Sequence, residues 1–117
     1  MVGYLFYPPA DTAQDRIWRD TVERWGESQA EAYVLGLHRH LQKLSITPAL
    51  WRVLPRSLAV PETLDVDVWF NRYEHHYIFF RKLFDGRIGI ISLLHERMDL
   101  PVRLTDDLLN ITRQNPT

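Results

Sequence analysis

The sequence contains no cysteine. This absence excludes a disulfide framework, thiolate zinc sites and cysteine nucleophiles, and it suits a reducing compartment. No apolar run approaches the roughly 20 residues that a membrane-spanning helix requires. The N-terminal stretch MVGYLFYPPAD also lacks the basic segment and the long apolar core of a signal peptide. We therefore expect a soluble, cytoplasmic protein with no membrane partner, folded as one domain over residues 1–117.

Acidic residues are missing from one long window of the chain. Between Ala32 and Pro61 there is no Asp or Glu, although the formal net charge of the whole chain is −1. The cations of this window are Arg39, Lys43, Arg52 and Arg56. Arginine outnumbers lysine twelve to two, and arginine suits bidentate contacts to carboxylates and phosphates. Two interpretations stay open, a solvated basic face and a surface that meets an acidic partner or nucleic acid.

Two amphipathic helices are predicted in the first half of the chain. Asp11-x-x-Gln14 is a capping-box variant that should begin a helix over residues 11–25, and Gly26 should end it. Ser28-x-x-Glu31 should cap a second helix over residues 28–46, whose apolar residues recur with a period of 3.6. The short connection between them predicts an antiparallel helical hairpin.

Strand patterns flank this hairpin. The aromatic run after His76 and the apolar run after Ile88 are separated by Asp85-Gly86, a strong signal for a tight turn with positive φ at both turn residues. Residues 48–64 contain three prolines and predict a long, irregular connection. The next segment alternates, with Trp69 on a face expected to be exposed. Strands are thus predicted at residues 2–7, 65–73, 76–83 and 88–94, and a short helix at 105–111, after Pro101.

These elements predict an α+β fold. We expect an antiparallel or mixed sheet of about four strands, with the helical hairpin on one face and a short C-terminal helix. The other face of the sheet should stay open and be rimmed with Arg and His, as a docking surface.

The element order and several short motifs resemble the ParE branch of the RelE/ParE toxin superfamily. These motifs are YPPADTAQDRIW, ERWGESQAEAYVLGL, HYIFFR and LLHERMD. The resemblance implies the toxin of a type II toxin–antitoxin system, which poisons DNA gyrase and is neutralised by a cognate antitoxin. It also implies a heterodimer or heterotetramer, or a homodimer of the toxin, with operator DNA bound only through the antitoxin. The RelE and YoeB branches instead cleave mRNA on the ribosome, and a third alternative is a non-toxic module that binds an antitoxin.

The resemblance also suggests where nuclease residues would lie. The nuclease branch ends its last strand with a catalytic pair, and the matching positions here are Arg97 and Met98. Met98 cannot transfer a proton. Glu74 and His76 match the nuclease carboxylate and phosphate-binding positions, and His95 should share a strand face with Arg97. A rearranged nuclease would therefore use Glu74, His76, His95 and Arg97, but the missing acid favours a toxin without enzymatic activity.

Candidate residues for binding the target or the antitoxin are mostly cations. They are Arg52, Arg56, Trp69, Arg72, Arg81, His95, Arg97, Met98 and Arg103. Glu96 and Asp99 are expected to pair with Arg97 or Arg103. His75 and His76 are adjacent on a predicted strand, so their side chains should point to opposite sides and cannot share a metal ion. No metal and no cofactor is expected.

Overall fold

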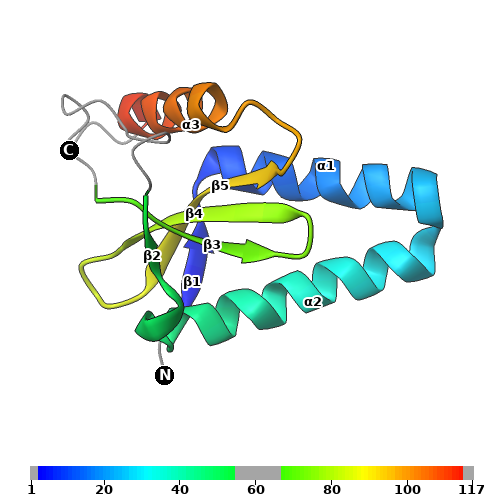
Figure 1. Ribbon diagram of the computed structural model, residues 1–117, viewed down its shortest axis with the longest axis horizontal. Helices are drawn as coiled ribbons and strands as arrows, with labels where there is room; N and C mark the ends of the chain where they lie inside the picture. The colour runs from blue at the N-terminus through cyan, green and yellow to red at the C-terminus, as the bar shows by residue number, and fades with distance from the viewer. Residues whose placement is uncertain (1–2, 55–66, 115–117) are drawn as a thin grey trace.

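A five-stranded mixed sheet forms the centre of the molecule, in the order β1-β5-β4-β3-β2 (Figure 1). The structure is a computed structural model, and it describes residues 3–54 and 67–114. The strands are β1 (Tyr4–Phe6), β2 (Arg52–Val53), β3 (Trp69–Tyr73), β4 (His76–Lys82) and β5 (Ile88–His95). The helices are α1 (Pro8–Trp25), α2 (Glu27–Ser45) and α3 (Leu100–Gln114), with a 3-10 turn at Pro48–Leu50. The predicted α+β class and order of elements are confirmed.

The sheet is mixed because its first strand runs parallel to its last. Tyr4 lies opposite Ile88 and Phe6 lies opposite Ile90, whereas β5, β4, β3 and β2 pair antiparallel in turn. Strand β5 therefore lies in the interior of the sheet, between β1 and β4, and every residue from Ile88 to Leu94 is buried. The prediction of about four strands missed only the two-residue strand β2, because two residues leave no periodic pattern to read.

Helices α1 and α2 form the predicted hairpin, although its caps differ from the prediction. Helix α1 begins at Pro8, with Pro8 and Pro9 in its first turn, where a missing N–H is no loss. Asp11 therefore lies inside the first turn and does not cap it. One residue, Gly26 (φ 91°), ends α1 and begins α2, so Ser28 is not the cap either. A positive φ there lets the chain reverse within a single residue.

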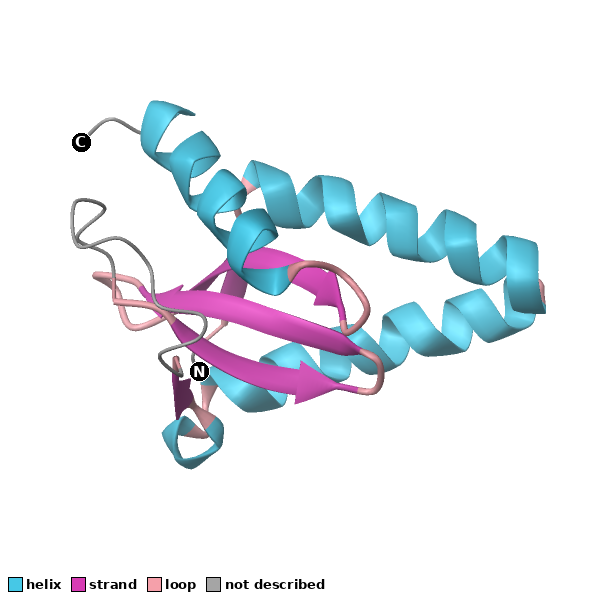
Figure 2. Ribbon diagram, turned by 45° about the horizontal axis from the view of Figure 1, so that its top comes forward, coloured by secondary structure: helices cyan, strands magenta, loops and turns pink. Residues whose placement is uncertain are grey.

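The hairpin covers one face of the sheet and α3 covers part of the other (Figure 2). On the hairpin side, Ile17, Leu37 and Leu41 pack against Ile78 and Phe80. On the α3 side the core contains a second set of apolar residues, namely Val68, Phe79, Ile91, Leu94, Leu104, Leu108 and Ile111. The predicted open face is therefore wrong. The C-terminal helix is also longer than predicted, because Pro101 lies in its first turn and does not stop it.

Strand β5 contains an irregularity that shifts the alternation of its side chains between the two faces. Phe79 pairs with Ser92 and Phe80 pairs with Ile90, so Ile91 is an extra residue on β5. As a result, neighbouring Ile91 and Ser92 both serve the α3 side, where the hydroxyl of Ser92 donates to Asp107 at 2.5 Å. Alternation alone would send side chains of β5 to both cores, and the bulge shifts its phase so that two consecutive residues face α3.

The turn between β4 and β5 differs from the predicted one. Gly86 has φ 91°, but Asp85 does not have a positive φ. The amide of Gly86 donates to the carbonyl of Leu83, and the amide of Leu83 donates to that of Arg87. This longer loop leaves Asp85 free to accept from the backbone and side chain of Arg87, at 3.0 and 2.8 Å.

Candidate partner-binding site

A cavity of about 600 Å³ lies between the helical hairpin and the ends of β4 and β5. Helix α1 forms one wall, the β3–β4 turn and the segment after β5 form the other, and Tyr33 of α2 closes one side. Its floor is apolar and its rim carries both charges. The lining residues are Ala13, Arg16, Ile17, Asp20, Thr21, Arg24, Trp25, Tyr33, His75, His76, Leu93, His95, Glu96, Arg97 and Met98.

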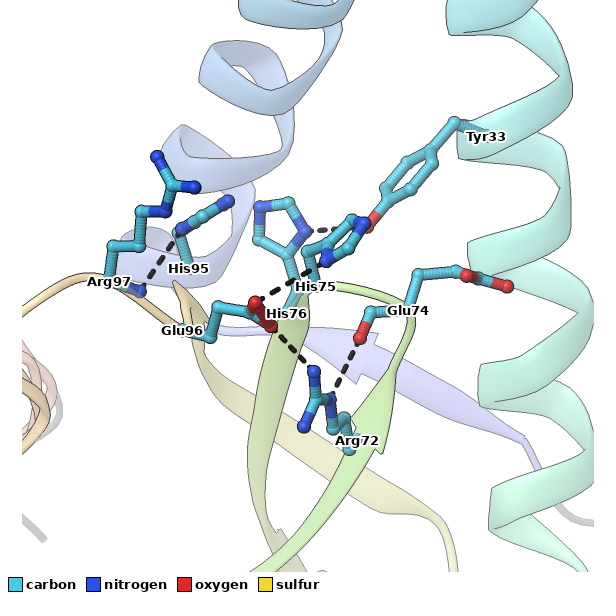
Figure 3. A network of polar contacts seen from close by, with 8 residues as sticks. All are labelled: Tyr33, Arg72, Glu74, His75, His76, His95, Glu96 and Arg97. Atoms are coloured by element: carbon cyan, nitrogen blue, oxygen red, sulfur yellow. Dashed lines mark hydrogen bonds and ion pairs between the residues drawn. The ribbon is translucent and has the colours of Figure 1, made fainter.

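Three imidazole rings meet at this cavity (Figure 3). His76 and His95 are opposite residues of β4 and β5, and their rings stand edge to face at 5.2 Å. The ring of His75 stacks on His95 at 6.3 Å. His75 lies in a two-residue turn after Glu74, whose φ of 51° swings the chain around. The prediction that His75 and His76 point apart is therefore wrong, because His75 is not in a strand. Even so, the described residues contain no group arranged to hold a metal ion.

His76 is fixed by a hydrogen bond to α2. The hydroxyl of Tyr33 lies 2.6 Å from its Nδ1. Burial, together with the neighbouring His95 and His75, lowers the pKa of His76 to about 4. Burial also raises the pKa of Tyr33 to about 12. At neutral pH the pair is therefore a neutral imidazole and a protonated phenol.

The residues after β5 take positions that the strand pattern did not predict. Strand β5 ends at His95, and the backbone amide of Arg97 turns back to donate to His95 Nδ1 at 3.1 Å. Arg97 therefore lies in a turn and not on the strand face of His95, as had been expected. Met98 is partly buried and packs against the α3-side core as well as lining the cavity.

Glu96 and Asp99 also differ from the prediction. Glu96 pairs with Arg72 at 2.6 Å and lies 3.5 Å from Nδ1 of His75. Arg72 in turn stands over the ring of Tyr77, 5.5 Å from its centroid. Asp99 accepts from the backbone amide of Val102 at 3.4 Å and so caps α3. Neither acid pairs with Arg97 or Arg103, because the turn after β5 brings Glu96 to Arg72 and Asp99 to the first turn of α3.

The cavity gathers only some of the predicted site residues. His76, His95, Arg97 and Met98 line it, and Arg72 adjoins it through Glu96. Glu74 does not line it, and its carboxylate points away from the imidazoles in Figure 3. The four-residue nuclease constellation is therefore not assembled as predicted. Arg81 lies near the far end of β4, and exposed Arg103 lines a smaller cavity between α1 and α3.

Arg52 and Trp69 lie on β2 and β3, at the side of the sheet away from β1. Arg52 is exposed on the edge strand β2. Trp69 is half-buried on the hairpin side, with its ring 5.9 Å from that of Trp51, so its strand face is not the exposed one. The role of Trp69 in partner binding stays a prediction. Arg56 lies outside the described residues.

The α1 and α2 contributions to the cavity were missed from the sequence. Arg16, Asp20 and Arg24 recur every four residues and so share one helix face. That spacing was available as a signal, but only the fold reveals that this face looks across at the histidines. Tyr33 falls among the periodic apolar residues of α2, so the sequence pattern predicts only a core residue there.

The histidines of α2 have structural roles. His38 bonds through Nδ1 to the hydroxyl of Tyr4, at 2.6 Å, and through Nε2 to Gln14. His40 bonds through Nε2 to Asn71 at 2.5 Å. These two histidines therefore connect α2 to β1, α1 and β3.

Comparison with known proteins decides the family. Residues 4–100 match the family described as ParE toxin of type II toxin-antitoxin system, parDE. The chain belongs to this family of toxins. The match covers β1 to the start of α3, and so includes both walls of the cavity.

Individual relatives agree with this assignment. Toxin ParE1 of Mycobacterium tuberculosis is 29% identical over 97 residues, which cover 83% of this chain and 92% of that protein. Toxin ParE of Escherichia coli is 27% identical over 108 residues, which cover 92% of this chain and 98% of that protein. The solved structure of a chromosomal ParDE system from P. aeruginosa has the same fold, with a TM-score of 0.62 at 18% identity over 81% of this chain and 96% of that one. The partner of a ParE-type toxin is an antitoxin.

Proposed function

We propose that this ParE-family toxin inhibits DNA gyrase, and so replication, without cleaving RNA. Membership of the ParE family is the observation that carries this proposal. The chemistry of the cavity also supports this proposal. A general acid or base works best with a pKa near the working pH. His76 with a pKa of about 4 and Tyr33 with a pKa of about 12 are both far from neutrality, and Met98 takes the position of the nuclease acid.

A ribosome-dependent mRNA nuclease is the second candidate. It is favoured by the meeting of His76, His95 and Arg97 in one cavity. Such an enzyme would need His95 to move a proton, because Glu74 lies outside the cavity. His95→Ala should then reduce mRNA cleavage about a hundredfold, the usual scale for losing an acid–base group.

The test uses purified toxin with purified gyrase. We expect the wild-type protein to block supercoiling or to trap cleaved DNA, and to leave mRNA on programmed ribosomes intact. His95→Ala should reduce gyrase inhibition only modestly, because no proton transfer is involved. Cleavage of ribosome-bound mRNA by the wild type, with gyrase unaffected, would replace this proposal by the nuclease.

We further propose that one domain over residues 1–117 acts in the cytoplasm as part of a heterodimer or heterotetramer with its antitoxin. Among the described helices, none is long and apolar enough to cross a membrane. Exposed Arg52 and neighbouring Arg56 should attract an acidic antitoxin, and reversing both charges should slow association and flatten its salt dependence. Association at the wild-type rate across salt concentrations would contradict this role of the basic window.

A further inference from the structure

The hydrogen bonds of the cavity determine which nitrogens of two imidazoles carry protons. The hydroxyl of Tyr33 stays protonated and lies 2.6 Å from Nδ1 of His76, so it can serve as the donor to this nitrogen. Nδ1 of His95 accepts the backbone N–H of Arg97. A ring nitrogen that accepts a hydrogen bond carries no proton, so the proton of His95 lies on Nε2, and that of His76 lies on Nε2 when Tyr33 is the donor.

These two Nε2–H groups are hydrogen-bond donors without a partner in the described part of the chain. Both residues line the cavity, and among the described residues no acceptor lies at either Nε2. Their rings are 5.2 Å apart at 89°, close enough for both to face one ligand group. The guanidinium of Arg97 also has no ion pair within the described part of the chain.

The charge around these donors favours an anion. Arg16 and Arg24 flank a single acid, Asp20, on the α1 wall, and Glu96 is already paired with Arg72. His76 adds no charge at neutral pH. The cavity lining thus has a small excess of positive charge, which lies on the exposed arginines of its rim. This excess suits a group with one negative charge better than a phosphate dianion.

The floor of the cavity favours an apolar carrier for that charge. Ile17 and Leu93 are almost completely buried at its base, with exposed fractions of 6% and 2%. Trp25 stands at the mouth with 73% of its surface exposed. A volume of about 600 Å³ has room for a few side chains and lies within the usual range of small-ligand pockets.

We propose that this cavity receives an Asp or Glu side chain of the antitoxin, held by Nε2–H of His76, Nε2–H of His95 and the guanidinium of Arg97. An apolar neighbour of that acid rests on Ile17, Leu93 and Trp25. The inference rests on the proposed pairing with an antitoxin, and adds to it the anchoring group and its receptor. It assigns to His76 and His95 a binding role in place of a catalytic one.

The first test is affinity for the full-length antitoxin. Arg97→Gln removes the charge, and His95→Asn keeps an acceptor near the Nδ1 position but withdraws the Nε2–H donor. Each should weaken binding about tenfold or more, the scale of one hydrogen bond to a charged group. His95→Gln, which places an N–H near the Nε2 position, should retain most of the affinity. Arg19→Gln is the matched control, because Arg19 is exposed on α1, lies outside the basic window and does not line the cavity.

The second test identifies the acid. Each antitoxin Asp or Glu is changed singly to its amide and measured against wild-type toxin and Arg97→Gln. One acid should lose its importance when Arg97 is already replaced, since a cycle of this kind isolates the pairwise interaction. In wild-type toxin, nitrogen NMR should report the Nε2–H form of both rings and should shift at His76 and His95 when the antitoxin is added.

Several results would overturn the inference. Wild-type affinity in Arg97→Gln and His95→Asn, or no acid coupled to Arg97, would exclude this receptor while leaving the pairing with the antitoxin intact. Loss of gyrase inhibition with normal antitoxin binding in these variants would assign the cavity to gyrase. Tight binding of inorganic phosphate or an RNA oligonucleotide, with antitoxin binding unchanged, would assign it to nucleic acid. Failure of wild-type toxin to bind the antitoxin would remove both proposals together.

Discussion

The two faces of the sheet are held in different ways. On the hairpin side, polar bonds accompany the apolar contacts: His38 and His40 reach to β1 and β3, and the hydroxyl of Tyr73 donates to the carbonyl of Tyr33 at 3.0 Å. On the α3 side, the described residues supply one buried polar link between helix and sheet, from Ser92 to Asp107. The other described side chains of the α3-side core are apolar.

This difference predicts a difference in adaptability. Directional hydrogen bonds fix the position of a helix, whereas apolar contacts tolerate small shifts. The hairpin side should therefore be rigid and intolerant of changes, and α3 should move to fill a gap. The rigid side is also the one that builds the cavity.

Adjacent phenylalanines of β4 provide the strongest test of this difference. Phe80 is fully buried on the hairpin side and Phe79 is fully buried on the α3 side. We expect Phe80→Ala to lower the free energy of unfolding by about 4–5 kcal/mol and Phe79→Ala by about 3 kcal/mol, because a site that collapses loses less. Urea unfolding of both variants measures the two values. Equal losses would show that α3 is held as firmly as the hairpin.

The close approach of α2 and β3 on the hairpin side should give a smaller change in stability. A Cβ built on Gly36 would lie 2.3 Å from the hydroxyl of Tyr73. Alanine is the better helix former by about 1 kcal/mol, yet Gly36→Ala should destabilise the protein by about 2 kcal/mol through this clash. Tyr73→Phe removes the hydroxyl and should recover part of the loss in the double variant. Thermal unfolding that finds Gly36→Ala more stable than wild type would mean that α2 shifts freely.

The Ser92–Asp107 link tests the other face. Burial raises the pKa of Asp107 above its ordinary 3.8, and the hydrogen bond from Ser92 opposes this shift. Ser92→Ala should therefore cost about 1 kcal/mol at neutral pH, at the low end for a group deprived of its partner, because Asp107 keeps some contact with solvent. Asp107→Asn in the Ser92→Ala background should return most of this loss.

The pH dependence of the same link has a definite sign. A carboxyl whose pKa is raised by folding contributes stability below pH 3.8, and this contribution is lost as the pH rises through the raised pKa. Asp107→Asn should remove this part of the pH dependence in unfolding curves collected from acid to neutral pH. An unchanged difference between wild type and Asp107→Asn over that range would contradict the raised pKa.

The tip of the β4–β5 hairpin belongs to neither face and should give the smallest effect. Phe84 is fully exposed there. Phe84→Ser should change the free energy of unfolding by less than about 0.5 kcal/mol. A larger loss in chemical denaturation would indicate that Phe84 packs in solution, and the variant otherwise serves as a control for correct folding.

The sequence predicted the hairpin face much better than the α3 face. Helices α1 and α2 carry long apolar stripes with a glycine between them, so their existence and pairing follow from periodicity. The helix predicted at residues 105–111 is shorter than α3, because the prediction places its start after Pro101. Proline is, however, tolerated in a first helical turn. The bulge at Ile91, which shifts the alternation along β5, has no sequence signal of its own.

The site was predicted in part because strand register is a local property. His76 and His95 fall at the ends of two strands joined by a short turn, so their meeting could be anticipated. The contributions of Tyr33, Arg16 and Arg24 could not, since they depend on the angle at which the hairpin crosses the sheet. The turn conformations at Glu74 and Arg97 redirected neighbouring side chains, which is why His75 joined the cluster and Glu74 left it.

The parallel pairing of β1 with β5 has a consequence for the order of events during synthesis. Tyr4 meets Ile88, so the first strand waits roughly 4–17 s for its partner at 5–20 residues per second. Helices α1 and α2 have emerged long before, but Leu93, His95 and Arg97 are among the late arrivals. A toxin chain therefore has no cavity to offer until residues 93–98 have been made, however early its helical hairpin forms.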